Sequence, residues 1–201
     1  MITIEGIDGA GKTTLARRLL VALRERGTQI ELLREPGGVQ ASEQIRNLVT
    51  DPDVVIGPRA EALLYAAARA QLVDEALVPL LDRGTWVLLD RFVDSSLAYQ
   101  GGGRALGVEA VREINRFGTG GLAPDRTLLL VIDPALGRSR SLDRGEGLDR
   151  LEREHADFHA RIAAVYEQLA DAEPDRIRRL DASLAEDQVL GAALAALDDL
   201  A

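Results

Sequence analysis

Residues 2–13 read Ile-Thr-Ile-Glu-Gly-Ile-Asp-Gly-Ala-Gly-Lys-Thr, and this stretch decides the fold. From Gly6 onward it matches the pattern G-x-x-x-x-G-K-[ST], in which a glycine-rich loop surrounds phosphate oxygens with backbone N–H groups. The pattern is informative where a strand precedes it and a helix follows it. Here the apolar run at 2–5 predicts the strand, and the spacing of Leu15, Leu19 and Leu23 gives residues 12–26 one apolar helix face. A phosphate-binding loop is therefore predicted at 6–13.

The loop residues have distinct chemical tasks. Lys12 is expected to reach the β- and γ-phosphates of ATP, and the Thr13 hydroxyl suits a magnesium ligand. The alternative is a glycine-rich turn without a ligand, but both flanking elements that the motif demands are predicted here. The residues expected to bind ATP are Gly6, Ile7, Asp8, Gly9, Ala10, Gly11, Lys12, Thr13 and Thr14.

Lys12 is also unusual in the composition. Lysine and arginine total 24, and Lys12 is the single lysine, which leaves 23 arginines. Arginine carries a wide planar fork, whereas lysine carries a compact charge on a slim stem. Position 12 is therefore expected to require an ammonium group, because a tight phosphate loop has room for a compact charge rather than a planar fork.

The overall composition excludes several classes of protein. The chain has no cysteine, so disulfides and thiolate metal sites are ruled out. A formal net charge of −9 argues against non-specific binding to a polynucleotide, but it is compatible with a local site for a small phosphate compound. The first residues carry neither a basic lead nor a long apolar run. We therefore expect no signal peptide or membrane anchor, and a cytoplasmic location.

Apolar runs alternate with amphipathic stretches, which predicts a single α/β domain over 1–201 with a five-stranded parallel sheet flanked by helices. Strands are predicted at 2–5, 29–33, 86–90, 126–132 and 177–180. Helices are predicted at 12–26, 42–48, 58–82, 106–117, about 152–169 and from about 184 onward. Pro79 is expected to bend or shorten the long helix at 58–82.

The segment 137–153 differs in character from the rest of the chain. It contains glycines, several acidic residues and the five arginines Arg138, Arg140, Arg144, Arg150 and Arg153. Such a stretch is either a solvated loop or a mobile lid over a site.

A phosphate-binding loop alone leaves a GTPase switch, a motor ATPase and a kinase of a small metabolite open. The guanine-binding segment of GTPases needs a second lysine, which this chain lacks. Motor ATPases usually need a larger module. The length of 201 residues and the arginine-rich segment favour a kinase.

Motifs beyond the loop resemble those of thymidylate kinases. Asp90-Arg91-Phe92, followed by Ser95, Tyr99, Gln100 and the run Gly-Gly-Gly-Arg at 101–104, is similar to the Asp-Arg-Tyr/His signature of that family. Arg-Glu-Pro-Gly-Gly at 34–38 resembles its second-strand motif, Tyr65 with Arg69 its base-binding pair, and Leu-Asp-Arg-Leu-Glu at 148–152 the end of its lid. The similarity follows nearly the whole chain in the right order.

The resemblance implies the P-loop NTPase fold of nucleoside monophosphate kinases, transfer of phosphoryl from ATP to dTMP with Mg²⁺, and a homodimer. It assigns dTMP binding to Asp8, Arg34, Pro36, Tyr65, Arg69, Arg91, Ser95, Ser96, Tyr99 and Gln100. It assigns catalysis to Lys12, Asp90, Arg91, Arg144 and Arg150, and magnesium to Thr13 and Asp90, directly or through water.

The chemistry of these residues supports the assignment. Asp90 at a strand end can hold magnesium or its waters, and Arg91 can fork onto an acceptor phosphate; the alternative is a buried structural ion pair. Tyr65 can stack on a pyrimidine while Arg69 donates to a base acceptor from the same helix face. The alternative is a core tyrosine beside a surface arginine.

Two positions inside the phosphate loop carry expectations of their own. Asp8 would repel phosphate, but in the family an acidic residue at this place contacts the sugar 3′-hydroxyl. Gly9 stands where some members carry an arginine, and glycine there is similar to the bacterial-type arrangement with lid arginines. Arg144 and Arg150 are the preferred candidates, although a solvated charge run remains the alternative for each.

One position departs from the family pattern, because Phe92 stands where Tyr or His is usual. A hydrogen bond from that ring is therefore lost.

Rival functions are a kinase of another nucleotide or of a free nucleoside, and a non-catalytic nucleotide-binding module. Arg91 together with Arg34 favours a charged acceptor over a neutral nucleoside.

Overall fold

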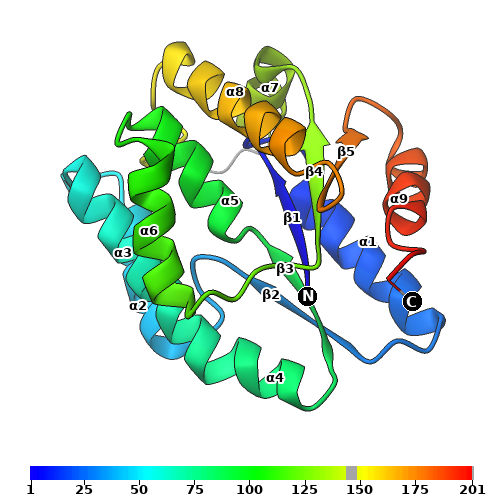
Figure 1. The fold of residues 1–201 in the computed structure, drawn as a ribbon. Helices are drawn as coiled ribbons and strands as arrows, with labels where there is room; N and C mark the ends of the chain where they lie inside the picture. The colour runs from blue at the N-terminus through cyan, green and yellow to red at the C-terminus, as the bar shows by residue number, and fades with distance from the viewer. Residues whose placement is uncertain (144–148, 201) are drawn as a thin grey trace.

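The computed structural model describes residues 1–143 and 149–200. Within them a five-stranded parallel sheet runs through the centre in the order β2-β3-β1-β4-β5 (Figure 1). The strands are β1 (Ile2–Gly6), β2 (Ile30–Arg34), β3 (Trp86–Asp90), β4 (Arg126–Val131) and β5 (Ile177–Asp181). The predicted sheet is confirmed, with strand ends that differ from the predicted ones by at most one residue.

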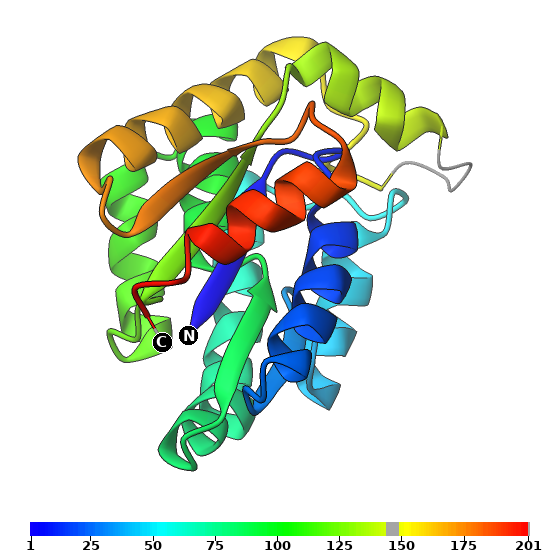
Figure 2. The same cartoon turned by 90° about the vertical axis from the view of Figure 1, so that its right-hand side faces the viewer.

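Helices cover both faces of the sheet. They are α1 (Lys12–Glu25), α2 (Gln40–Thr50), α3 (Pro58–Leu72), η1 (Val73–Leu77), α4 (Val78–Asp82), α5 (Val93–Ser96), η2 (Leu97–Gly103), α6 (Val108–Thr119), α7 (Pro134–Asp143), α8 (Ala156–Ala172) and α9 (Glu186–Ala195). Helices α1 and α9 lie side by side in both ribbon views (Figures 1 and 2). Helix α3 packs against α2 and α6, and α8 packs against η2.

The alternation of side chains along a strand sends neighbouring residues to opposite faces of the sheet. In β1, Ile2 and Ile4 belong to the main core together with Leu15 and Leu19 of α1. Thr3, one residue away, faces the other way and shares a hydrogen bond with Thr127 on β4 (Oγ1 to Oγ1, 2.7 Å). The central strands β1 and β4 are buried along nearly their whole length, as expected for parallel strands covered by helices on both faces.

The long helix predicted at 58–82 is present but not uniform. Helix α3 passes into the wide-turned segment η1, and α4 follows it without a break. Pro79 lacks the N–H that would bond to the carbonyl four residues earlier, so a regular α-helical ladder cannot run through it. The widened segment ends at Leu77, two residues before the proline, and accommodates the missing hydrogen bond.

Three features differ from the sequence-based expectation. Residues 134–143 form α7, so the first part of the segment expected to be a loop or lid is helical. Helices α5 and η2, at 93–103, were not predicted. The beginning of α8 is also later than expected, because residues 150–153 form turns and residue 154 a bend.

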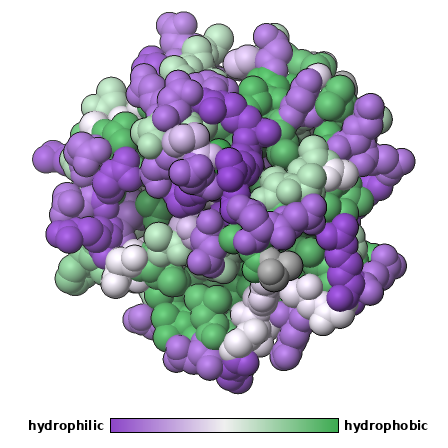
Figure 3. Space-filling view, turned by 45° about the vertical axis from the view of Figure 1, so that its right-hand side comes forward, coloured by the Kyte–Doolittle hydropathy of each residue, from purple (hydrophilic) through white to green (hydrophobic). Residues whose placement is uncertain are grey.

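The surface is mixed in polarity. On the face drawn in Figure 3, hydrophilic side chains surround several hydrophobic areas. None of the helices within 1–143 and 149–200 is long and apolar enough to cross a bilayer.

A close contact between two glycines fixes α7 on the phosphate loop. A Cβ atom built on Gly9 would lie 1.9 Å from the carbonyl oxygen of Gly137, and one on Gly137 would lie 2.8 Å from the carbonyl oxygen of Asp8. These distances leave no space for a side chain on either side. Because the obstacle is backbone, it can yield only if α7 moves.

We therefore expect Gly9→Ala to destabilise the protein more than Gly11→Ala. Both glycines have positive φ (78° and 93°), so alanine meets similar backbone strain at either position, but no atom lies within 4 Å of a Cβ at Gly11. The collision at Gly9 should add roughly 1–3 kcal/mol of destabilisation, or about 2–12 °C in Tm. Thermal unfolding of both variants without nucleotide measures the difference, and equal melting temperatures would contradict the contact.

Candidate active site

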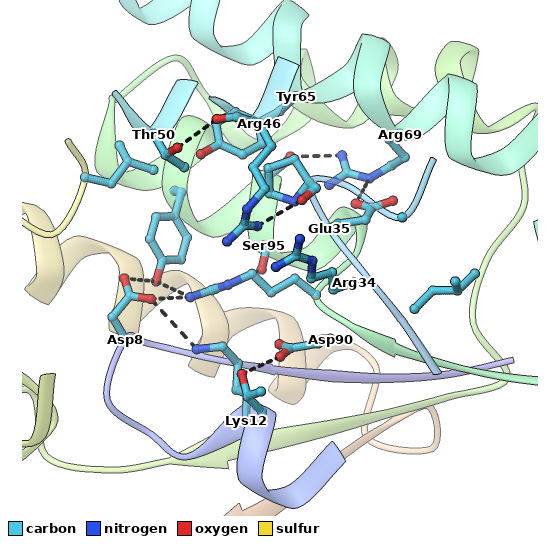
Figure 4. A pocket seen from close by; sticks show the side chains of 18 of the residues that line it. Asp8, Lys12, Arg34, Glu35, Arg46, Thr50, Tyr65, Arg69, Asp90 and Ser95 are labelled. Atoms are coloured by element: carbon cyan, nitrogen blue, oxygen red, sulfur yellow. Dashed lines mark hydrogen bonds and ion pairs between the residues drawn. The ribbon is translucent and has the colours of Figure 1, made fainter. Parts of the chain in front are cut away.

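A cavity of about 780 Å³ lies at the carboxyl ends of β1, β2 and β3. This is where ligands bind in open parallel sheets, because the loops that follow the strands diverge there. In Figure 4, Asp8, Lys12 and Asp90 lie at one end of the cavity, and Tyr65, Arg69 and Glu35 lie at the other. The cavity therefore joins the phosphate loop to the residues expected to bind a base.

The phosphate loop connects β1 directly to α1. Gly6 needs its positive φ of 139°, and a side chain there would collide with the carbonyl oxygen of Leu130. Gly11 precedes α1 in a left-handed conformation, so the first N–H groups of the helix face the loop. The buried Lys12 donates from Nζ to the carbonyl oxygen of Ile7 (2.8 Å). Burial and the positive charge of Arg91 lower the pKa of Lys12 to about 8.

Thr13 and Asp90 are direct neighbours. The Thr13 hydroxyl donates to Oδ2 of Asp90 (2.7 Å), across the gap between α1 and the end of β3. A hydroxyl and a carboxylate beside a phosphate loop form a donor set that Mg²⁺ accepts, since this ion usually takes one or two protein oxygens together with phosphates and water. Among the described residues there is no group of three His, Cys, Asp or Glu side chains that could hold an ion without a nucleotide.

A second cluster combines Asp8, Arg91 and Tyr99. Nη2 of Arg91 donates to Asp8, and the Tyr99 hydroxyl donates to Oδ2 of the same carboxylate (2.7 Å). The Arg91 guanidinium also lies over the Tyr99 ring, 5.0 Å from its centroid. Burial alone would raise the pKa of Asp8, but Arg91, Lys12 and the Tyr99 hydrogen bond outweigh it and lower the pKa to about 2. Asp8 is therefore ionised at neutral pH.

Arg69 is buried at the other end of the cavity, and its orientation is fixed. Nε donates to Oε2 of Glu35 (2.6 Å), Nη1 to Ser96 (2.9 Å) and Asn115, and Nη2 to the carbonyl oxygen of Phe92 (2.9 Å). An arginine has five N–H groups, so these four bonds leave one Nη2–H without a partner in the described part of the chain. Arg69 can still donate one hydrogen bond to a ligand in the cavity.

Comparisons with known proteins agree with this geometry. A family model for thymidylate kinase matches residues 4–192. The thymidylate kinase of Deinococcus radiodurans is 50% identical over 188 residues, which cover 94% of this chain and 91% of that protein. The thymidylate kinase of Lactobacillus delbrueckii subsp. bulgaricus is 46% identical over 196 residues, covering 96% and 92%. The chain belongs to the thymidylate kinase family.

A solved structure supports the same conclusion. The crystal structure of thymidylate kinase from Ehrlichia chaffeensis superimposes with a TM-score of 0.79 at 27% identity, over 99% of this chain and 96% of that one. The chain is thus a nucleoside monophosphate kinase with the P-loop fold expected from its sequence. The non-catalytic module is not favoured.

The structure brings most of the predicted thymidylate kinase residues to one cavity. Its lining includes Asp8, Lys12, Thr13, Arg34, Pro36, Tyr65, Arg69, Asp90, Arg91, Ser95, Ser96, Tyr99 and Gln100. The unpredicted helices α5 and η2 carry four of these residues, from Ser95 to Gln100.

Phe92 does not line the cavity but points into the core, where the Arg69 guanidinium lies 5.5 Å from its ring centroid. The polar tip usual in the family is missing at a buried position.

Of the two preferred lid arginines, the structure describes only Arg150, and it does not place Arg150 at the phosphate loop. Arg144 lies outside the described residues. Arg150 is turned away from the cavity lining: Nη1 pairs with Oε2 of Glu61 (2.7 Å), and Nε donates to the carbonyl oxygen of Val49 (3.0 Å). The fully buried Glu61 also accepts from Gln100 (2.9 Å) and Arg104 (3.1 Å). In this conformation Arg150 ties the 149–152 turn to α2 and α3.

The sequence alone did not single out Arg46 or Glu35. Both line the cavity. Arg46 of α2 donates to the carbonyl oxygen of Pro36 (2.9 Å), and burial together with the charge of Arg34 lowers its pKa. Oε1 of Glu35 is buried without a hydrogen-bond partner in the described structure. Glu35 belongs to the second-strand motif, which was a usable signal. Arg46 lies on the short amphipathic helix α2, and nothing in the sequence distinguishes it from the other 22 arginines of the chain.

Glu5 is a further buried acid beside the site. Its carboxylate accepts hydrogen bonds from the Phe92 N–H and the Ser95 and Tyr166 hydroxyls (2.6–2.9 Å). Burial and the nearby Asp94 raise the pKa of Glu5 from 4.5 to about 7, and these donors and Arg91 only partly oppose the rise. The folded protein therefore binds a proton at Glu5 over a pH range in which the unfolded chain has released it.

This raised pKa predicts a pH dependence of stability. Between pH 4.5 and 7 only the folded state holds the Glu5 proton, so the free energy of unfolding should fall as the pH rises through this window. Because a tenfold difference in proton affinity is worth about 1.4 kcal/mol, the upper limit of this fall is roughly 3 kcal/mol. Urea unfolding at pH 4.5 and pH 8 should show a smaller difference for Glu5→Gln than for the wild type. Parallel curves would mean that the pKa of Glu5 is not raised.

Proposed function

We propose that this thymidylate kinase transfers the γ-phosphoryl group of Mg²⁺-bound ATP to the phosphate of dTMP, using the residues that line the cavity. Membership of the family makes the chain a kinase of dTMP. The observation that carries the assignment of residues is the single cavity with the phosphate loop at one end and Tyr65 and Arg69 at the other. A donor nucleotide and an acceptor nucleotide would meet between them.

The donor end is formed by the phosphate loop, 6–14. Its N–H groups and Lys12 would hold the phosphates of ATP, and the buried ammonium is close enough to the loop to meet the γ-phosphoryl. Thr13 and Asp90 would hold magnesium, Asp90 directly or through water. The ion supplies positive charge that neutralises the phosphates during transfer.

The acceptor phosphate would bind at Arg91, supported by Arg34 and Arg46. In the structure Arg91 and Asp8 pair with each other. dTMP offers each of them a partner of its own, because its phosphate can accept from Arg91 and its 3′-hydroxyl can donate to Asp8. Binding of dTMP thus exchanges one partly buried ion pair for two charged hydrogen bonds, which keeps both charges compensated.

The base would lie against Tyr65 and Arg69, with Pro36, Ser96 and Gln100 around it. Arg69 is held by four hydrogen bonds, so its remaining N–H has a fixed direction. A fixed donor prefers a base with an acceptor at that point, and thymine presents one at O4. Tyr99, between Asp8 and Arg91, would support the sugar.

The reaction needs no covalent intermediate with the protein. An oxygen of the dTMP phosphate attacks the γ-phosphorus, the bond to the β–γ bridging oxygen breaks, and ADP leaves with that oxygen. The protein contributes by aligning the two phosphates in line and by placing positive charge around the transferred group. Lys12, Arg91 and arginines of the 137–153 lid would supply that charge. Arg150 can do so only after leaving Glu61.

We further propose that residues 1–201 form one kinase domain that works in the cytoplasm as a homodimer. Two exposed apolar side chains on packed helices support the dimer: Phe117 on α6 is 92% exposed, and Leu63 on α3 is 57% exposed. Such side chains on neighbouring helices are commonly covered by a symmetric copy of the same face.

Substrate choice should be asymmetric among pyrimidine monophosphates. Cytosine carries an amino donor where thymine carries O4, so the Arg69 N–H would face another donor and dCMP should be nearly inert, by up to ~10⁴-fold. dUMP lacks only the methyl group and should lose ~10–200-fold. ADP release, measured with each monophosphate at fixed Mg²⁺ and ATP, gives the order dTMP, dUMP, dCMP. A preference for dCMP over dUMP would overturn both the role of Arg69 and the function.

The dimer has a direct test with a matched control. Phe117→Asp should shift the protein to the monomer in sedimentation velocity, because a charge would be buried at the interface. Val55→Asp is the control, since Val55 is 99% exposed in the connection between α2 and α3. A wild-type protein that sediments as a monomer at micromolar concentration, or equal effects of the two substitutions, would contradict the proposed interface.

A further inference from the structure

Glu5 lies one residue before the phosphate-loop motif and does not line the cavity. Its side chain is completely buried on the face of β1 opposite to Ile4. Oε1 accepts from the Phe92 N–H (2.7 Å), and Oε2 accepts from the hydroxyls of Ser95 (2.6 Å) and Tyr166 (2.9 Å). Nothing in the transfer reaction described above uses this carboxylate.

The contact with Ser95 determines what that serine can do for Arg91. A serine hydroxyl has one hydrogen and two acceptor lone pairs. When Glu5 is ionised it accepts the hydrogen of Ser95, so the Ser95 oxygen accepts from Nη1 of Arg91 (3.1 Å) and lies 3.0 Å from the Tyr166 hydroxyl. The second hydrogen of Nη1 goes to the carbonyl oxygen of Gly6 (3.2 Å). Glu5 thus determines that Ser95 donates toward Glu5 and accepts from Arg91, rather than the reverse.

The contact with Phe92 acts on the backbone of Arg91. Arg91 has a φ of 75°, a left-handed conformation that a residue with a side chain rarely adopts. Its own N–H donates to the carbonyl oxygen of Ile4 (3.0 Å), and the following N–H, of Phe92, donates to Glu5. Two successive residues of β1 therefore hold the peptide groups on both sides of the Arg91 Cα atom.

We propose that Glu5 is a positioning residue that aims Arg91 at the acceptor phosphate, through the Phe92 peptide and the Ser95 hydroxyl. The inference rests on the proposed function, in which Arg91 binds that phosphate. Through Ser95, Glu5 holds Nη1 of Arg91 in its hydrogen bonds to the protein. Nη2, which donates to Asp8 and Tyr99, is the nitrogen that would turn to the ligand. The donor end of the site does not depend on this chain of bonds.

The test compares Glu5→Gln with a control on the same strand. Glutamine keeps the size of the side chain but offers only one oxygen for the three donors. Thr3→Val is the control, because Thr3 is equally buried on the same face of β1, and its hydrogen bond goes to Thr127 rather than toward Arg91. For each variant we would measure Tm, kcat, and the KM values for dTMP and ATP.

We expect Glu5→Gln to raise the KM for dTMP about tenfold, the cost of one charged hydrogen bond, and to leave the KM for ATP within about twofold. Thr3→Val should lower Tm without changing either KM. Equal changes in the two KM values, or an unchanged KM for dTMP in a folded Glu5→Gln protein, would reduce Glu5 to a structural residue.

Ser95 provides a second test that holds even if Glu5→Gln does not fold. Ser95→Ala should raise the KM for dTMP, and Ser95→Thr, which restores the hydroxyl, should return it to within about twofold of the wild type. Where Glu5→Gln folds, adding it to Ser95→Ala should raise the KM less than the product of the two single effects, because both act on Arg91 through a shared bond. A KM for dTMP in the double variant that equals the product of the two single effects would overturn the proposal, and so would a failure of threonine to restore it.

Arg91→Ala separates this proposal from the function on which it rests. If that variant keeps the wild-type KM for dTMP, Arg91 does not bind the acceptor, and the proposed function fails at this residue. If Arg91→Ala raises the KM strongly while Glu5→Gln and Ser95→Ala have no effect, the function stands and the positioning role of Glu5 fails.

Discussion

The parallel register between β1 and β3 is the constraint on which the active site depends. Ile4 of β1 pairs with Asp90, the last residue of β3, and β3 in turn pairs Asp90 with Arg34 of β2. Because all three strands point the same way, their carboxyl ends lie at one edge of the sheet. This register places Asp90 beside Thr13 and Arg91 beside Asp8, although some 80 residues separate the partners in the chain. A shift of two residues in that pairing would move the Asp90–Arg91 pair about 7 Å along the strand, away from the phosphate loop.

Buried and partly buried carboxylates fix the directions of the arginines in the cavity and beside it. Glu35 holds Arg69, Asp8 holds Arg91, and Glu61 holds Arg104 and Arg150. Buried ion pairs add little net stability, since desolvation offsets their attraction. Their effect here is geometric, because a guanidinium with most of its N–H groups engaged can offer a ligand only the directions that remain. A chain with a net charge of −9 can in this way present a cationic cavity to nucleotides.

The sequence predicted the sheet, the phosphate loop and most of the cavity lining, because these depend on local signals. A short apolar run such as 86–90 favours a strand that is buried on both faces, and glycines with a lysine at fixed spacing have few other uses. The sequence did not predict η2, because three glycines at 101–103 disfavour a helix. Packing against α6 and α8 keeps them in one. Gly102 and Gly103 are needed there, because side chains would meet Val165 and Phe158 of α8. Nor did it predict the partners of Arg150, because Glu61 lies far away in the chain and no local pattern connects them.

The single lysine gives this protein a selective chemical handle. Lys12 carries the only side-chain amine in the sequence, and its pKa of about 8 leaves a large reactive fraction in mildly alkaline buffer. An amine-directed reagent small enough to enter the cavity would therefore modify side chains at one position, inside the phosphate loop. The absence of cysteine removes the usual competing nucleophile. Covalent labelling at Lys12, followed by mass spectrometry, would thus report directly whether the donor end is occupied, with nucleotide protection as the signal.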